Sequence, residues 1–516
     1  MRNQIKAGTV LSYLQIALSV IIGLVYTPIM LQLLGKAEYG LYNSVASLTA
    51  MLSVLSLGFN TCYIRYYSKY KTEADSEEKI RGLNGLFLLI FVIIGLVALL
   101  CGLFLCENLT LVFDEGLTAE EYSTARTLML LLAINLAISF PMSVFANIVS
   151  AHERFVFLKA LNILKTVLSP FLAIPLLLLG FKSVGIVVAT LAVSVITDLL
   201  YFYYVKVKLK QRFRFRGFEP GIGRDLFAYT FFVALHLIVD QINWNVDKIL
   251  LGRFRGTGET AVYSVGYSLY SYYMTIGLPL TGMFTPRVHF LVEETANDLP
   301  ARRRGLTEML VKVARIQWLV LGLVLTGLVF FGKPFIGFWA GEGYEAAYYV
   351  ALLLVIPGTA DLIQNLGIAM QRAQNKHKFR AIVYIAMAFV NVLISIVLCK
   401  RYGAVGSAIG TAISLILVQG VIINIYYHKK CNIDVIAFWK SIGRLSLGML
   451  PPCIVGLALY LLLDFSSIWL LGAGIAVYTG VYCLSMYLLG MNAYERGLVN
   501  RVLTKIGLKK LILRKD

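Results

Sequence analysis

The sequence predicts an all-α polytopic membrane protein with about fourteen transmembrane helices, arranged as two pseudo-symmetric six-helix lobes plus two C-terminal helices. Three observations support this prediction: a long series of apolar runs, a bias of positive charge between them, and an internal repeat. Of the 516 residues, 59% are hydrophobic and only 15% are charged, and the mean hydropathy is +0.76. Soluble globular proteins carry about 25% charged residues. The composition therefore excludes a soluble enzyme, and it is also too apolar for a disordered chain.

Fourteen apolar runs are long enough to cross a bilayer core, which is about 30 Å thick and requires about 20 residues of helix. They are expected near residues 8–34, 41–63, 82–106, 124–149, 156–180, 184–206, 225–251, 261–286, 308–332, 344–370, 379–399, 403–428, 443–464 and 467–490. The first run is too long for the apolar segment of a signal peptide, and no small-residue cleavage site follows it. It is therefore predicted to be the first membrane helix.

Positive charge favours an even number of helices with both termini in the cytoplasm. With the first residue placed inside, the cytoplasmic segments hold 35 of the 47 Lys and Arg residues, and the outer segments hold eight. This is the bias that the positive-inside rule describes, and an odd number of helices would remove it. The net charge of +19 is therefore assigned to membrane topology and to anionic membrane lipids as partners, and not to nucleic acid.

The longest cytoplasmic connector, residues 206–224, contains K-V-K-L-K-Q-R-F-R-F-R and separates the sixth run from the seventh. It acts either as a topology determinant or as a contact for anionic headgroups. We expect it to join an N-terminal lobe (1–212) to a C-terminal lobe (213–428). Residues 429–516 then hold the last two helices and a basic tail, whose apolar residues share one helical face as in cationic helices that lie on an inner membrane surface.

The two halves of the chain repeat each other. L-G-K-A-E-Y-G-L-Y from Leu34 corresponds to L-G-R-F-R-G-T-G-E-T-A-V-Y from Leu251. V-G-I-V-V-A-T from Val184 corresponds to V-G-S-A-I-G-T from Val405, at an offset of 221 residues. Repeats of this kind in a transporter place the substrate path between the halves and indicate alternating access.

These motifs carry a family resemblance that covers essentially the whole chain. L-G-x-x-x-Y-G-x-Y after the first run, the K-F opening of the eleventh run and Y-G-A-V-G-S-A-I-G-T from Tyr402 resemble one superfamily. It is the multidrug/oligosaccharidyl-lipid/polysaccharide exporter superfamily, and the resemblance is to its polysaccharide-flippase branch, with Wzx-type O-antigen and capsule flippases as the nearest members. The chain departs from the usual pattern after the seventh run, where the loop from Arg253 is about three residues longer than its counterpart.

The resemblance implies a two-lobed fold around a V-shaped cavity in a bacterial plasma (inner) membrane. It implies export of undecaprenyl-diphosphate-linked oligosaccharide repeat units, with other polysaccharide-assembly proteins as further partners. Two alternatives stay open: a cation-coupled multidrug exporter of the same superfamily, and a membrane polysaccharide polymerase or acyltransferase. The polymerase is disfavoured because such enzymes typically have a large external loop, and the outer loops here are short.

No catalytic or metal-binding pattern accompanies these features. The sequence holds no P-loop, HExxH or GxSxG motif, its five His residues are dispersed, and its seven cysteines form no CxxC pair. We therefore predict a transporter and not an enzyme. It is expected to need no cofactor or metal and to use a Na⁺ or H⁺ gradient.

Three basic residues are candidates for binding the diphosphate. Charge inside a membrane span is costly, so it usually faces a cavity or a partner. Lys165, in the fifth run, is the strongest candidate, with a snorkelling or structural lysine as the alternative. Arg65 and Arg287 close the second and eighth runs, where each either binds the diphosphate through paired hydrogen bonds or anchors the topology. Arg315, near a helix end, is interpreted as an anchor.

Three further residues are candidates for contact with the substrate. Tyr267 belongs to a Tyr-rich eighth run, whose rings either bind a sugar face or pack against neighbouring helices. Asp361 and Asn365, together with Gln364, form a polar patch in the tenth run, after the helix-bending Pro357.

The seventh run carries the candidate residues for ion coupling. His236, Asp240, Asn243 and Asp247 are spaced at i, i+4, i+7 and i+11, which places them on one helical face. Two carboxylates and a histidine could bind Na⁺ or relay protons. The alternative is that these side chains pair with another helix.

Overall fold

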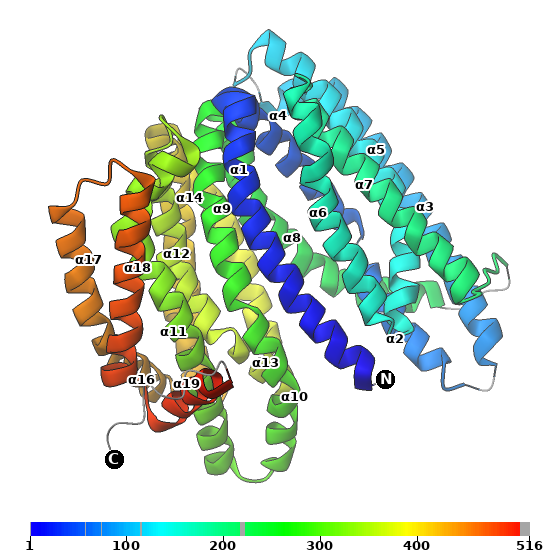
Figure 1. Cartoon of the computed structure of the whole chain (residues 1–516). Helices are drawn as coiled ribbons and strands as arrows, with labels where there is room; N and C mark the ends of the chain where they lie inside the picture. Colours follow the sequence, from blue (N-terminus) through cyan, green and yellow to red (C-terminus); the bar gives the residue numbers. More distant parts are fainter. Residues whose placement is uncertain (1, 57, 74, 114–115, 217–221, 506–516) are drawn as a thin grey trace. The chain divides into compact units, whose positions relative to one another are not determined.

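The computed structural model describes the chain apart from residues 1, 57, 74, 114–115, 217–221 and 506–516. Nearly all of the described residues are helical, and none of them is in a strand (Figure 1). Among these described residues, ten helical stretches are long and apolar enough to cross a membrane. The protein is therefore an all-α multi-pass membrane protein, which confirms the predicted fold class.

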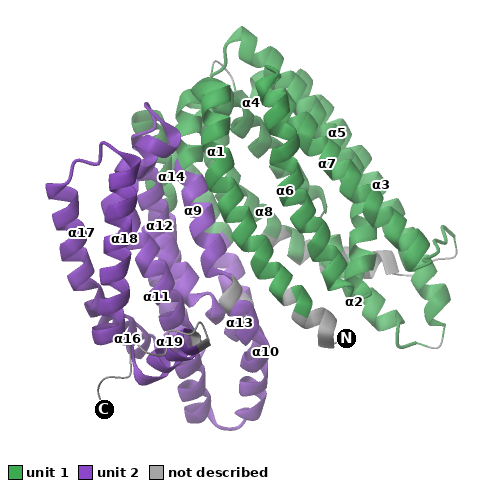
Figure 2. Ribbon diagram, in the orientation of Figure 1, with its two compact units in different colours: residues 1–265, 385–411 green, residues 266–384, 412–516 purple. Residues whose placement is uncertain are grey.

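The chain divides into two compact units, which Figure 2 shows in different colours. Unit 1 comprises residues 1–265 and 385–411, and unit 2 comprises residues 266–384 and 412–516. The boundaries fall inside two helices, α9 (Thr257–Gly277) and α14 (His377–Leu415). This division reflects proximity in space, whereas the lobes 1–212 and 213–428 and the segment 429–516 reflect the sequence repeat and stay a prediction.

Unit 1 is built from α1 to α8, from the short helices η1 and η2, and from parts of α9 and α14. Their bounds are α1 (Arg2–Leu52), η1 (Ser53–Ser56), α2 (Phe59–Tyr70), α3 (Ser76–Glu107), α4 (Leu109–Phe113), α5 (Ala119–Ala151), α6 (Phe155–Leu178), α7 (Lys182–Tyr203), η2 (Tyr204–Lys208) and α8 (Ile222–Phe254). A capping box starts α5: Thr118 Oγ1 accepts from the Glu121 N–H (3.3 Å), and Glu121 Oε2 accepts from the Thr118 N–H (2.8 Å). Both bonds satisfy amides that the helix itself leaves unpaired.

Unit 2 contains the remaining helices and the other parts of α9 and α14. Their bounds are α10 (Pro279–Glu294), α11 (Leu299–Ala340), α12 (Ala346–Gln364), α13 (Leu366–Ala373), η3 (Ile416–Ile422), α15 (Ile423–Lys430), α16 (Val435–Ser446), η4 (Leu447–Met449), α17 (Leu450–Leu462), α18 (Ile468–Ser485), η5 (Met486–Gly490) and α19 (Ala493–Lys505). At the start of α16, the Asp434 carboxylate accepts from the Ala437 N–H (3.0 Å) and lies near Arg303. These contacts lower the pKa of Asp434, chiefly through the backbone hydrogen bond.

Two of the ten apolar stretches each contain two predicted spans. They cover Val10–Tyr70, with 61 residues, and Lys378–Lys430, with 53. Inside them the backbone leaves the helical region at Gly35 (φ 75°, ψ 171°) and at Gly403 (φ 57°, ψ −135°), where the sequence predicts short turns. Glycine tolerates these dihedral angles because it has no Cβ. The seventh predicted span corresponds to α8, and the eighth corresponds to α9 and α10 together. With these two, the described helices account for the fourteen predicted spans.

Gly403 also permits a close approach to a carboxylate of unit 1. Glu259 Oε2 accepts a hydrogen bond from the Ala404 N–H (2.7 Å), and a Cβ on Gly403 would collide with the same carboxylate. The second half of α14 therefore starts with its first free amide satisfied by a side chain from α9.

The basic connector between the sixth and seventh spans is bound to the start of α3. The Asn84 side chain accepts from the Tyr63 hydroxyl (2.7 Å) and donates to the Arg212 carbonyl (3.1 Å). The Arg214 N–H donates to the Arg81 carbonyl (2.9 Å). A Cβ on Gly85 would overlap the Arg214 carbonyl oxygen, so the glycine allows this contact. Residues 217–221 of the connector lie outside the described part of the chain.

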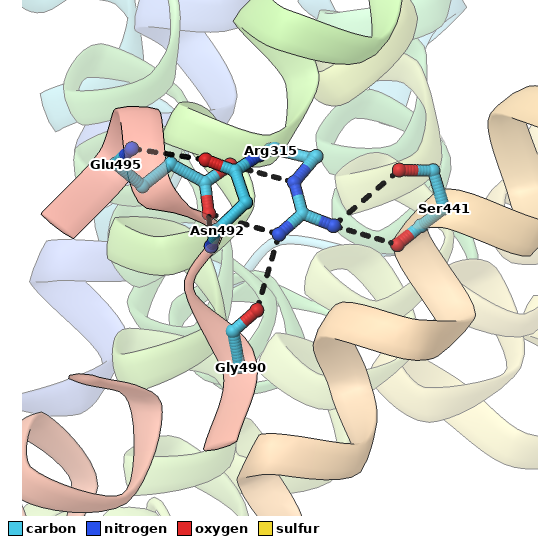
Figure 3. A network of polar contacts seen from close by, with 5 residues as sticks. All are labelled: Arg315, Ser441, Gly490, Asn492 and Glu495. Atoms are coloured by element: carbon cyan, nitrogen blue, oxygen red, sulfur yellow. Dashed lines mark hydrogen bonds and ion pairs between the residues drawn. The ribbon is translucent and has the colours of Figure 1, made fainter. Parts of the chain in front are cut away.

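A buried ion pair fixes α19 to α11 in unit 2, as Figure 3 shows. Arg315 donates to both carboxylate oxygens of Glu495 (2.6 and 2.8 Å), to the Gly490 carbonyl (3.1 Å), and to the carbonyl and hydroxyl of Ser441 (3.1 and 3.4 Å). Asn492 caps α19 and donates its N–H to the same carboxylate (2.9 Å). Because its side chain is only 9% exposed, Arg315 is a buried ion-pair partner that joins α11 to α19, and not the helix-end anchor that the sequence predicts.

The amphipathic tail is described only as far as Lys505. Helix α19 exists where the tail was expected, and Leu498, Val499 and Leu503 are half-buried. The rest of the predicted amphipathic segment falls in residues 506–516, outside the described residues.

Candidate functional site

A buried carboxylate accepts three hydroxyl hydrogen bonds inside unit 1. Asp247 of α8 is 2% exposed. Its Oδ1 accepts from Ser407 Oγ (2.6 Å), and its Oδ2 accepts from the Tyr263 hydroxyl (2.7 Å) and from Thr411 Oγ1 (2.7 Å). Lys248, the next residue, is also buried. The three hydroxyls occupy three of the carboxylate's four or so lone-pair positions.

Local sequence explains how these hydroxyls reach Asp247. Gly256 has a positive φ of 83°, which lets the chain turn sharply between α8 and α9 and brings Tyr263 back alongside α8. Ser407 and Thr411 are four residues apart and therefore share one face of α14. They lie in the V-G-S-A-I-G-T motif, so the internal repeat was the available signal for both residues, although neither was predicted as part of the site.

For the other three candidate residues for ion coupling on the seventh run, the structure gives less detail. Asp240 and Asn243 are half-buried. The side chain of His236 lies outside the described residues. The structure therefore brings Asp247 into a polar cluster with α9 and α14, and the ion-coupling role of all four residues stays a prediction.

A second polar cluster lies in unit 2, around Asp361 and an arginine that was not predicted. Asp361 Oδ1 is 3.6 Å from Arg380 Nη2. Arg380 donates to the hydroxyls of Tyr384 and Tyr427, the latter at 3.2 Å. The Gln419 side chain donates to the Tyr384 hydroxyl. Arg380 follows the basic loop before the eleventh span. The positive-inside rule explains a basic residue there by topology alone, so its pairing with Asp361 was not predicted.

The other basic candidates lie at more exposed positions. Lys165 is exposed on α6, within electrostatic range of Asp198 on α7. Arg65 is exposed on α2. Arg287 donates to Glu294 on the same helix (3.3 Å), and both side chains are more than half exposed. An exposed pair of this kind contributes little stability, so Arg287 is held only weakly.

The remaining candidates lie on α9 and between α12 and α13. Tyr267 is half-buried and packs edge-on against Tyr270, with ring centroids 6.3 Å apart. Asn365 is half-buried between α12 and α13, one turn beyond Asp361. Asp361 and Asn365 therefore lie one turn apart in unit 2. The binding roles of the six predicted residues stay a prediction.

A comparison with known families identifies the chain. The sequence profile of a family described as polysaccharide biosynthesis protein matches residues 5–286, which is more than half of the chain. The chain belongs to this family. The match includes both the L-G-K-A-E-Y-G-L-Y motif of unit 1 and the buried Asp247.

Two curated proteins are similar in sequence to this chain. A candidate O-antigen transporter of Shigella flexneri is 20% identical over 415 residues, which span 78% of this chain and 92% of the relative. The teichuronic acid biosynthesis protein TuaB of Bacillus subtilis is 26% identical over 143 residues, or 28% of each chain.

Solved structures of transporters share the fold of this family member. The lipid II flippase MurJ, in an inward closed conformation, matches with a TM-score of 0.68 and 18% identity, over 95% of this chain and all of MurJ. The MATE multidrug transporter DinF-BH matches with a TM-score of 0.57 and 15% identity, over 83% of this chain and 96% of that one. These structural matches show the fold. The family match and the O-antigen relative confirm the predicted polysaccharide branch, and the similar proteins support the prediction of a transporter and not an enzyme.

Proposed function

We propose that the protein is a flippase for undecaprenyl-diphosphate-linked oligosaccharide repeat units. It moves them by alternating access from the inner to the outer leaflet of a bacterial plasma membrane, with both termini in the cytoplasm. The observation that carries this proposal is the polysaccharide biosynthesis profile over residues 5–286. The O-antigen relative, which aligns over 78% of this chain, supports the same substrate class. MurJ supports it through its fold and through its description as a lipid flippase.

The polar groups inside the spans support a path for a hydrophilic headgroup. In this proposal Lys165, Arg65 and Arg287 attract the diphosphate, while Tyr267, Asp361 and Asn365 contact the sugars. The oxygen atoms around Asp247 form a hard donor set, which suits Na⁺ or a proton. Asp240, Asn243 and His236 complete the proposed coupling path along α8.

Deletion of the gene tests the transport function directly. We expect surface polysaccharide to disappear and lipid-linked glycan to accumulate on the inner leaflet, and we expect the restored gene to reverse both effects. Surface polysaccharide that is unchanged, without an inner-leaflet intermediate, would contradict the proposal. A drug-efflux assay on the same strains tests the multidrug alternative, which predicts raised drug sensitivity and unaltered glycan.

Replacement of Lys165 by alanine is expected to lower glycan export by about tenfold or more, because a hydrogen bond to a charged group contributes about 1.5–3 kcal/mol. Export is measured in the deletion strain at matched protein levels. Lys159→Ala, a change of the same residue type on the same helix, is the control and should leave export near wild type. Full export by the Lys165→Ala protein would remove Lys165 from the substrate path.

Replacement of Asp240 by asparagine is expected to abolish the dependence of transport on an ion gradient, because an amide cannot exchange a proton or supply a full negative charge to Na⁺. The measurement is transport into proteoliposomes with imposed Na⁺ or H⁺ gradients and matching ionophores. Asp464→Asn, an exposed position between α17 and α18, is the control. Gradient dependence that persists in the Asp240→Asn protein would exclude Asp240 from coupling.

A further inference from the structure

Two arginines on spanning helices of unit 2 have very different surroundings. All three guanidinium nitrogens of Arg315 donate hydrogen bonds, and both oxygens of Glu495 accept them (Figure 3). The hydrogen-bond donors of Arg315 are therefore all engaged within the protein. Arg380 has a side chain almost as well buried, with 12% exposed.

Arg380 is only partly coordinated. Among the described residues, its hydrogen bonds go to two neutral hydroxyls, those of Tyr384 and Tyr427. The carboxylate of Asp361 lies at 3.6 Å, beyond hydrogen-bond distance. A guanidinium has five N–H donors, so several donors of Arg380 can still take a stronger acceptor.

A buried amide next to this pair also lacks partners. Gln364 lies one turn after Asp361 on α12 and is 2% exposed. Within the described part of the chain, neither its side-chain oxygen nor its side-chain nitrogen has a hydrogen-bond partner. Unsatisfied polar groups at membrane depth are energetically costly. The unpaired amide of Gln364 and the unused donors of Arg380 are the groups that a polar ligand would satisfy in this segment.

Glycines make the cluster compact. A Cβ on Gly358 would lie 2.7 Å from the Tyr270 hydroxyl, and one on Gly367 would collide with the Tyr427 hydroxyl. Both tyrosines are thus held against α12 and α13, and Tyr427 in turn holds Arg380. The guanidinium is oriented by tyrosines and is not fixed by its carboxylate.

We propose that Arg380 binds the diphosphate of the lipid-linked substrate, and that Asp361 competes with the diphosphate for the same guanidinium. This inference rests on the proposed function. Arginine recognises phosphate groups through paired hydrogen bonds, which are stronger than the long contact to Asp361. Because one anion replaces another, the guanidinium never stays unpaired in apolar surroundings, and Asp361 limits affinity so that the substrate can leave.

The test measures equilibrium binding of radiolabelled undecaprenyl diphosphate to the full chain in phosphatidylcholine nanodiscs. Arg380→Gln should weaken binding by about tenfold or more. Arg380→Lys should give an intermediate loss, since it keeps the charge but not the paired hydrogen bonds. Asp361→Asn should strengthen binding by about threefold or more, because it removes a nearby negative charge. Arg372→Gln, an exposed position on α13, is the matched control and should bind as wild type.

The opposite signs separate ligand binding from a structural role. If the pair served only stability, Arg380→Gln and Asp361→Asn would both weaken binding and lower the melting temperature, and this result would overturn the inference. Binding by Arg380→Gln at the wild-type level would also overturn it. Competition by phosphatidylglycerol as strong as that by undecaprenyl diphosphate would overturn it too, because the site would then take any anionic headgroup.

Export measured with the same variants separates this inference from the proposed function. A wild-type chain that binds undecaprenyl diphosphate through Arg380 but does not restore export in the deletion strain would overturn the flippase proposal and leave the binding site standing. An Arg380→Gln chain that binds and exports like wild type would overturn only the role of Arg380.

Discussion

Replacement of Arg315 by methionine is expected to destabilise the protein by about 3–5 kcal/mol, because removal of one partner leaves the other charge buried and unpaired. The remaining charge would be that of Glu495, whose side chain is only 3% exposed. The carbonyl of Gly490 and the oxygen atoms of Ser441 would lose their donor as well. The measurement is the melting temperature of the purified protein in detergent.

A double variant distinguishes an unpaired charge from simple loss of packing. Arg315→Met with Glu495→Met removes both charges and should recover much of the lost stability, since apolar replacements of a buried ion pair are often neutral or stabilising. Arg303→Met, at an exposed ion pair with Asp434, is the control and should change little. Equal destabilisation by the single and the double Arg315 variants would show that the charge pairing is not the cause.

Replacement of Asp247 by asparagine is expected to lower export by about tenfold or more while the protein still inserts into the membrane. The three hydroxyls of Tyr263, Ser407 and Thr411 now donate to two carboxylate oxygens. An amide has only one acceptor oxygen, so at least one hydroxyl must turn round and accept, and hydrogen bonds to a charged group contribute about 1.5–3 kcal/mol each. Any ion held at this position would also lose its carboxylate ligand.

Export and melting temperature should be measured together for this site. Thr411→Val removes one hydroxyl and keeps the carboxylate, so its export should fall less than that of Asp247→Asn. If Asp247→Asn exports normally, Asp247 has only a structural role. If both variants lose export only in proportion to protein level, the cluster serves folding and not transport.

Hydropathy and charge were sufficient to predict the membrane fold. Regular apolar runs placed the spans, and the turns at Gly35 and Gly403 fall where short breaks were expected, even though each lies inside one continuous helical stretch. The positive-inside rule works at the level of whole loops. It treats every basic residue in a loop or near a helix end alike, so it could not separate Arg315 and Arg380 from ordinary anchors.

The site could be predicted only in part, because its polar side chains pair with residues that are far away in sequence. Asp247 and Asp361 were recognisable because a carboxylate in an apolar run is rare. Their partners were not, since Ser407 and Thr411 lie 160 and 164 residues from Asp247 in sequence. Glu495 lies 180 residues from Arg315, in a segment that resembles a surface helix. Only the packing of helices brings such residues together.

The burial of Glu495 sets a practical limit for protein engineering at the carboxyl end. A truncation before Ala493 would remove the counter-charge of Arg315 and should give poorly expressed, easily degraded protein. A chain that keeps the whole of α19 retains this counter-charge, so a fluorescent reporter or affinity tag should be placed without cutting into the helix.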